Sequence, residues 1–178
     1  MHDIWTDEYE SEGHKLSDKV HESLRIFTKN IDPATGELKI PEEELKLRVD
    51  LRKKRIFTID PITAKDLDDA LSIDKITDSI YEIGVHIADV SYFVTQGSEL
   101  DLEAQLRCTS TYFVHKVYPM LPRLLCEKLC SLNPDVDRLS YSIFYRIDIN
   151  TGEIDKSYIP KICRSVMRSC AKWNYQLV

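Results

Sequence analysis

The pattern of hydrophobic and polar positions predicts several strands along the chain. Residues 54–60, 69–75 and 80–90 are rich in β-branched and aromatic residues, which is the composition of strands that lie partly buried in a sheet. Residues 139–149 alternate between apolar and polar side chains in a strand-like way. These stretches predict a mixed or antiparallel sheet.

Two segments with the same turn chemistry predict hairpins. The pattern Ile-Asp-x-x-Thr-Gly-Glu occurs at residues 31–37 and again at 147–153. The glycine of each segment supplies the positive φ angle that a tight turn requires. The second segment follows the strand at 139–149, so we expect the chain to return from Ile154 as the hairpin partner of that strand. We interpret the repeat as one turn chemistry used twice and not as a duplicated domain.

Short helices are expected between the strands. Ser98-Glu-Leu-Asp101 resembles a capping box and predicts a helix to about Arg107. Pro122 suits the first turn of a second helix that runs through Leu129. Residues 1–46 are charge-rich and show little apolar periodicity, so we expect an irregular arm there. The predicted fold class is therefore α+β, with short helices around the sheet.

Composition narrows the class of protein. A chain of 178 residues suits one domain, or one domain with an arm, and can bury a core. No apolar run approaches the length of a membrane span and the N-terminus is acidic, so we expect neither a membrane protein nor a signal peptide. The five cysteines form no CxxC pair, which favours reduced thiols. The net charge of −6 argues against a free-standing nucleic-acid-binding module, but not against an enzyme that holds phosphates through metal ions.

The chemistry concentrates where the first predicted strand ends. Asp60, Asp66, Asp68 and Asp69 lie within ten residues, and Lys65 is the only cation among them. Two unit charges about 6 Å apart repel by about 3 kcal/mol at an effective dielectric of about 20. Carboxylates held together at the end of a buried strand therefore require cations. Mg²⁺, which prefers oxygen ligands, is the first candidate.

Three other interpretations of this acidic segment compete with a magnesium site. It could be a solvated loop, although apolar residues flank it on both sides. A calcium loop of the EF-hand type fits poorly, because Lys65 and Ser72 occupy the positions where that loop has glycine and glutamate. An unrelated Mg²⁺-dependent phosphotransferase would need a glycine-rich phosphate loop, and the five glycines form none. Mg²⁺ held by a wall of carboxylates, with positions open to substrate oxygens, fits better.

Together with other segments, the acidic motif resembles one family closely. Asp60-Pro-x-x-x-x-Asp66-x-Asp68-Asp69-Ala70 is similar to the signature of the ribonuclease II/ribonuclease R (RNB) family of 3′-to-5′ exoribonucleases. The likeness is greatest to the eukaryotic Dis3-like branch that favours uridylated RNA. It extends over segments that stand in the family's order and spacing: Arg48-Val-Asp-Leu-Arg52, Val85-His-Ile-Ala-Asp-Val-Ser91, Pro119-Met-Leu-Pro122 and Leu129-Cys-Ser-Leu-Asn-Pro134.

The resemblance implies an activity and its residues. It implies hydrolysis of single-stranded RNA from the 3′ end to nucleoside monophosphates by two metal ions, Mg²⁺ or alternatively Mn²⁺. Asp60, Asp66, Asp68 and Asp69 stand at the positions of the family's catalytic metal ligands. Tyr175 aligns with the tyrosine that positions the terminal nucleotide, and Tyr112 aligns with an aromatic residue that stacks on a base further up the channel. Such stacking tolerates any base sequence.

Several other polar and aromatic residues receive a lesser role. His86 and Asp89 are expected to be structural or to support the site indirectly, since histidine is an unusual ligand among carboxylates that choose Mg²⁺. Arg107 and Arg123 could contact phosphates, although charges on exposed helices more often face water. Trp173 stands where the family commonly has leucine, which could change the packing beside Tyr175.

The resemblance also implies how the chain is organised. Residues 1–46 are expected to be a connecting arm from upstream cold-shock domains, and residues 47–178 to be the N-terminal portion of the RNB catalytic domain. A helix is expected to begin at residues 175–178, and the length suggests a fragment that is inactive by itself. A cytoplasmic location, including processing bodies, is expected, while the oligomeric state stays open. The alternative is a non-catalytic truncated or degenerate copy that acts as a binding or scaffold piece.

Overall fold

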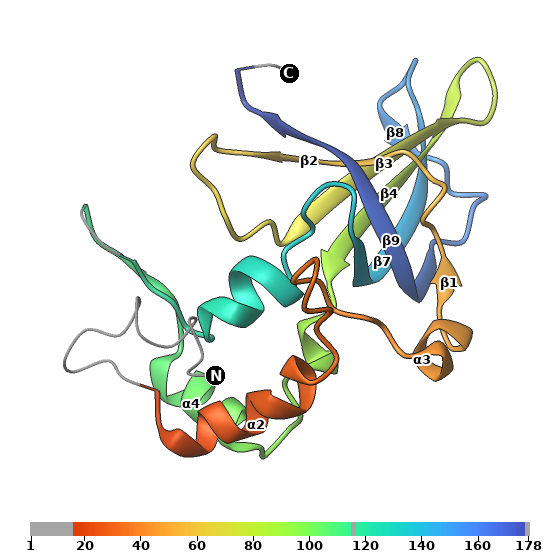
Figure 1. The fold of residues 1–178 in the computed structure, drawn as a ribbon. Coiled ribbons are helices and arrows are strands. Elements are labelled where there is room, and N and C mark those ends of the chain that lie inside the picture. The colour runs from red at the N-terminus through yellow and green to blue at the C-terminus, as the bar shows by residue number, and fades with distance from the viewer. Residues whose placement is uncertain (1–15, 115–116, 177–178) are drawn as a thin grey trace. The chain divides into compact units, whose positions relative to one another are not determined.

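A computed structural model describes residues 16–114 and 117–176 of the chain (Figure 1). These residues divide between two compact units. Ile40–Asp89 with Cys130–Val178 forms one unit, which we call the barrel unit. Met1–Lys39 with Val90–Leu129 forms the other, which we call the helical unit.

Strands of the barrel unit close into a ring. β2 pairs with β3, β3 with β4 and β4 with β7, all antiparallel, and β9 pairs with both β7 and β2. β1 and β8 extend the sheet beside β9 and β7. The strands are β1 (Val49–Asp50), β2 (Ile56–Asp60), β3 (Asp69–Lys75), β4 (Ile80–Ala88), β7 (Asp137–Asp148), β8 (Glu153–Ile154) and β9 (Lys161–Asn174). The strands predicted at 54–60, 69–75, 80–90 and 139–149 are thus confirmed within one or two residues.

The long strand β9 completes the ring (Figure 1). Its first half pairs antiparallel with β7, from Lys161 opposite Phe144 to Arg168 opposite Asp137. Its second half pairs parallel with β2 and ends with Asn174 opposite Asp60. Because β9 is antiparallel to one neighbour and parallel to the other, the sheet is mixed, as expected. The sequence had not singled out this strand.

Many of the side chains inside the barrel are small or polar. Along β2, β3 and the second half of β4, alternate residues are buried, as the period of a strand requires. A narrow barrel leaves little space at its axis, so small residues at many inward positions suit its taper. The buried polar residues on these strands are Thr58, Ser72, His86, Ser140, Ser142, Ser165 and Ser169.

The helical unit corrects one expectation. The predicted irregular arm contains the helix α2 (Asp18–Thr28). Ser17 caps it by accepting a hydrogen bond from the Val20 N–H, and Val20 and Leu24 lie buried one turn apart on its inner face. Phe27 packs edge-on against Phe93, with ring centroids 5.1 Å apart. The amphipathic signal was too short to stand out among charged residues, and tertiary packing stabilises the helix.

Other local predictions agree with the structure. α4 (Glu99–Arg107) begins at Ser98, whose Oγ accepts a hydrogen bond from the Asp101 N–H at 3.2 Å. The predicted second helix is a π-helical segment, η2 (Leu124–Leu129), and not an α-helix. The remaining elements are α3 (Glu42–Lys46) in the barrel unit and η1 (Val90–Tyr92), β5 (Thr111–Tyr112) and β6 (Val117–Tyr118) in the helical unit.

Both predicted hairpin turns form. Ile31 bridges Leu38 across a turn with Gly36 at φ 70°. Ile154 pairs with Ile147 across a turn with Gly152 at φ 73°. Both glycines therefore adopt the left-handed conformation that their turns require.

Two further expectations concern the end of the chain and the membrane. β9 continues to Asn174, and Tyr175 and Gln176 form a turn after it. The rest of the helix expected at 175–178 lies outside the described residues. Among the described helices, none combines the length and apolar character needed to cross a bilayer.

Candidate active site

Strands β2 and β3 carry the predicted acidic residues at one end of their hairpin. β2 ends with Asp60 and β3 begins with Asp69, and residues 61–68 connect them. Asp66 and Asp68 lie in this connection on either side of Leu67, which is completely buried. The barrel therefore brings all four predicted aspartates to one region of the barrel unit.

The electrostatics of the aspartates show that they are near one another. Burial raises the pKa of the Asp60 carboxyl above its ordinary value, the Thr58 hydroxyl lowers it, and the charge of Asp69 raises it again. Desolvation raises the pKa of Asp68, and the charges of Asp66, Asp69 and Asp60 raise it further. The Asp68 side chain keeps an exposed surface, so partial crowding by the protein, and not full burial, causes this desolvation.

Asp60 contains the feature that points most directly to a ligand. Its Oδ2 atom is buried and accepts no hydrogen bond from any described residue. The nearby Thr58 Oγ1 is also buried without a hydrogen bond of normal geometry, although it is close enough to influence the carboxylate. A buried carboxylate oxygen without a partner is costly, and a divalent cation is the partner that suits an anionic oxygen among other carboxylates.

The carboxylates do not share a single point of convergence. Within residues 16–114 and 117–176, no three His, Cys, Asp or Glu side chains are gathered closely enough to hold a metal ion. Like charges repel, so carboxylates gather tightly only around a cation. Four carboxylates, one with a buried oxygen that no described residue satisfies, are the kind of donor set that Mg²⁺ or Mn²⁺ prefers, although their side chains are not gathered around one point.

Tyr175 is placed beside the aspartates by the pairing of β9 with β2. Asn174 lies opposite Asp60 in the parallel ladder, and Tyr175 is the next residue. Its side chain is 66% exposed, so its ring is available to a ligand. The preceding Trp173 stacks on Phe57 with ring centroids 4.4 Å apart. The strand that leads to Tyr175 is therefore held by an aromatic contact on β2.

Tyr112 belongs to the helical unit. It lies on β5, in the hairpin with β6, and its side chain is 67% exposed.

Arg107 and Arg123 do not simply face water. Arg107 pairs with Glu103 and donates to the carbonyl of Pro119, and Arg123 pairs with Glu127 and donates to the carbonyl of Val117.

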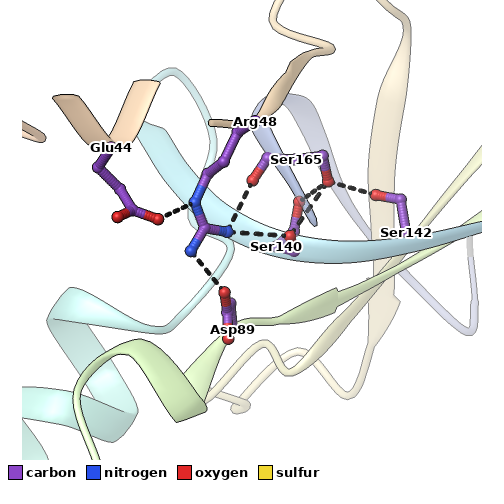
Figure 2. A network of polar contacts seen from close by, with 6 residues as sticks. All are labelled: Glu44, Arg48, Asp89, Ser140, Ser142 and Ser165. Carbon is purple, nitrogen blue, oxygen red and sulfur yellow. Dashed lines mark hydrogen bonds and ion pairs between the residues drawn. The ribbon is translucent and has the colours of Figure 1, made fainter. Parts of the chain in front are cut away.

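His86 and Asp89 occupy structural positions, as expected. His86 is buried inside the barrel, with Nε2 3.0 Å from Ser72 Oγ and Nδ1 2.7 Å from Ser142 Oγ. Asp89 is buried against Arg48, with 2.6 Å between Asp89 Oδ2 and Arg48 Nη2 (Figure 2). Arg48 also pairs with Glu44 and donates to the carbonyls of Ser140 and Ser165.

Two residues at the site were not singled out from the sequence. The Lys172 ammonium donates to the carbonyl of Ala64 at 2.5 Å and lowers the pKa of Asp60. The Ser131 hydroxyl contacts the backbone on both sides of Asp66. Both residues lie in segments covered by the family resemblance. That resemblance was the one feature of the sequence that could have pointed to them.

Comparison with known proteins decides the family. The sequence profile of the RNB domain matches residues 48–178. The chain belongs to the RNB family. This confirms the resemblance drawn from the aspartate motif.

Individual relatives of this RNB chain agree. A Xenopus tropicalis protein named DIS3-like exonuclease 2 is 57% identical over 136 residues, which are 76% of this chain and 16% of that protein. An Arabidopsis thaliana protein named Inactive exonuclease DIS3L2 is 46% identical over 136 residues, which are 76% of this chain and 12% of that protein. The RNB chain thus spans a small part of the length of the relatives that it matches.

A solved structure confirms the fold class. Mycoplasma genitalium RNase R, in complex with ribose methylated single-stranded RNA, matches 89% of this chain and 25% of its own chain, with a TM-score of 0.72 and 29% identity. The α+β fold expected for part of an RNB domain is therefore confirmed.

Proposed function

We propose that this chain carries the acidic site of a metal-dependent 3′-to-5′ exoribonuclease that hydrolyses single-stranded RNA to nucleoside monophosphates. One observation carries the proposal. Four aspartates at the end of the β2–β3 hairpin lie in one another's electric field, and Asp60 holds a buried carboxylate oxygen that no described residue satisfies.

Each residue of the site would contribute separately. Asp60, Asp66, Asp68 and Asp69 would hold two ions, Mg²⁺ or Mn²⁺. When bound, such ions lower the pKa of an attacking water and stabilise the charge that develops on the leaving 3′ oxygen. Asp60, partly buried at the end of β2, gives the set a fixed anchor, and the exposed Asp68 keeps a face open to substrate. Lys172 compensates part of the negative charge at Asp60.

Tyr175 would orient the terminal nucleotide at this site. Its exposed ring follows the residue opposite Asp60. Stacking of a base on an aromatic ring is worth about 1–3 kcal/mol and does not depend on base identity. Tyr112 would stack on a base further from the 3′ end. The RNase R relative was solved with single-stranded RNA, which supports this class of substrate.

Finer parts of the proposal rest on the family resemblance. They are a preference for uridylated 3′ ends, a cytoplasmic location that includes processing bodies, and the role of residues 1–46 as a connection from cold-shock domains.

A non-catalytic role is the second candidate. A relative at 46% identity is named an inactive exonuclease, so overall similarity does not decide activity. The four aspartates of this chain are all present, which favours catalysis. If the non-catalytic role holds, the chain would bind RNA or a partner without hydrolysing a phosphodiester.

Replacement of one aspartate separates the two candidates. In the intact protein, Asp69→Asn should lower the rate of degradation of a uniformly labelled single strand by about 100-fold or more, since metal ions supply several kcal/mol of transition-state stabilisation. RNA binding should be largely retained. Asp78→Asn is the matched control, because Asp78 is exposed in a turn where it pairs with Lys75.

Two measurements decide between the candidates. One is the release of labelled nucleoside monophosphates, and the other is Mn²⁺ binding measured by titration calorimetry. The proposal requires Mg²⁺-dependent release of nucleoside monophosphates by the wild type and the Asp78→Asn variant, and its loss in Asp69→Asn. Equal degradation by Asp69→Asn and wild type would defeat it. Absence of both Mn²⁺ binding and degradation in the wild type would favour the non-catalytic candidate.

A further inference from the structure

Residues 61–68 connect β2 to β3, and we call this segment the acidic connection. A single buried hydroxyl holds it on both sides of Asp66. Ser131, in the segment that precedes β7, has no exposed surface. Its Oγ accepts a hydrogen bond from the Leu67 N–H at 3.0 Å and donates one to the Lys65 carbonyl at 3.0 Å. These two groups belong to the peptide units immediately before and after Asp66, so one side chain fixes both.

The next peptide units are held as well. The Leu132 N–H donates to the Leu67 carbonyl at 2.9 Å, and the Ala88 N–H donates to the Asp68 carbonyl at 2.9 Å. The four successive peptide units from Lys65 to Asp69 therefore each make a hydrogen bond to another segment of the barrel unit. Because this connection has no strand ladder of its own, these contacts determine the direction of its backbone.

The support for Ser131 is itself fixed. The Ser131 carbonyl accepts a hydrogen bond from Arg138 Nε at 2.8 Å, and Arg138 on β7 is buried. Leu67, between the two acids, has no exposed surface and anchors the same segment. Ser131 therefore connects the acidic residues to the barrel wall through hydrogen bonds.

We propose that Ser131 is a positioning residue of the acidic site, which fixes the backbone around Asp66 so that Asp66 and Asp68 present their carboxylates to a divalent cation. The inference rests on the proposed function. The physical reason is that one hydroxyl can donate and accept at once. An apolar side chain would release both peptide units. Groups that orient metal ligands typically change metal affinity about 10–100-fold when they are removed.

A merely structural serine would behave differently. Ser142 provides the comparison, because it is equally buried and its hydroxyl contacts His86 and Ser165, away from the acidic connection. Loss of either hydroxyl should lower the stability of the fold. The positioning role predicts that loss of Ser131 alone changes metal affinity and the exchange of the Leu67 amide.

The test compares Ser131→Ala, Ser131→Thr and Ser142→Ala in the intact protein. We expect Ser131→Ala to weaken Mn²⁺ binding about 10-fold or more by titration calorimetry, and to accelerate hydrogen exchange at the Leu67 amide. Ser142→Ala should bind Mn²⁺ as the wild type does, and Ser131→Thr, which keeps the hydroxyl, should recover most of the affinity. If Ser131→Ala does not fold, Ser131→Cys replaces it, since a thiol hydrogen-bonds only weakly.

The outcomes distinguish this inference from the proposed function. Wild-type Mn²⁺ affinity in folded Ser131→Ala or Ser131→Cys would overturn the positioning role and leave the proposed function standing. An equal loss of affinity in Ser142→Ala would also overturn it, because the effect would then be a general loosening of the barrel. A wild-type protein that binds no Mn²⁺ would overturn the proposed function, and the positioning role with it.

Discussion

Arg48 and Asp89 form an ion pair that is almost completely removed from solvent. Arg48 Nη2 lies 2.6 Å from Asp89 Oδ2, and the two side chains are 0% and 3% exposed (Figure 2). Arg48 enters just before β1, and Asp89 directly follows β4. The pair therefore joins the start of the barrel unit to the end of one of its central strands.

Removal of one partner of this pair should be costly. Arg48→Met removes the cation that both Asp89 and Glu44 contact, and should lower the free energy of unfolding by about 3–5 kcal/mol. Asp89→Leu leaves Arg48 with Glu44 as its remaining counter-ion and should cost less. The double variant should lose clearly less than the sum of the two, because neither charge of the buried Arg48–Asp89 pair remains. Urea denaturation of the single and double variants measures these differences.

An exposed pair of the same unit serves as the control. Lys75 and Asp78 are 2.8 Å apart, with side chains 54% and 103% exposed. Lys75→Ala should change the free energy of unfolding by no more than about 1 kcal/mol. A similarly small effect for Arg48→Met would contradict the structural role of the buried pair.

His86 should make the protein sensitive to mild acid. Burial, together with the charge of Lys54, lowers the pKa of His86 from 6.5 to about 4. The buried ring favours the neutral form, so its contribution to stability is complete above the unfolded pKa and is lost as the pH falls towards 4. At about 1.4 kcal/mol per pKa unit, the loss is about 3 kcal/mol.

Comparison with His86→Gln isolates this effect. The wild-type free energy of unfolding should fall relative to that of the variant between about pH 7 and pH 4. Taking the difference removes the contribution of the carboxylates that titrate in both proteins. Parallel pH profiles for the two proteins would show that His86 does not titrate in this way.

Gly84 should not tolerate a side chain. A Cβ atom at this position would lie 2.4 Å from Ser72 Oγ, 2.8 Å from His86 Nε2 and 2.9 Å from Phe144 Cε1. Because these neighbours fill the barrel interior, Gly84→Ala should lower the free energy of unfolding by about 1–3 kcal/mol or more. Ser72→Ala in the same chain removes the closest contact and should recover part of the loss. No recovery in the double variant would argue against this packing.

Tyr175 should act through its ring. Under the proposed function, Tyr175→Ala in the intact protein should lower kcat/KM for a single-stranded RNA about 5-fold to 150-fold, which corresponds to the loss of about 1–3 kcal/mol of stacking. Tyr175→Phe keeps the ring and should stay near the wild-type value. If both variants lose equal activity, the hydroxyl and not the stacking surface is what matters.

Local patterns in the sequence determined much of this protein. The strands at Ile56–Asp60, Asp69–Lys75 and Ile80–Ala88 follow from β-branched and aromatic composition, and the turns at Gly36 and Gly152 follow from the left-handed conformation of glycine. The acidic motif is also local, because Asp60 directly follows the apolar residues of its own strand, so the sequence by itself places it at a strand end.

Tertiary structure decided the contacts between distant segments. β9 closes the barrel through pairings with β2, more than 100 residues earlier in the chain, and no local pattern indicates such a partner. The serines and His86 inside the barrel satisfy one another's hydrogen bonds, so their burial is invisible to a pattern based on hydrophobicity. Helix α2 depends on packing that its own charged sequence does not reveal. The hydrogen bonds of the Ser131 hydroxyl to Leu67 and Lys65 join residues that are separated by 64 and 66 positions in the sequence, so only the folded chain brings them together.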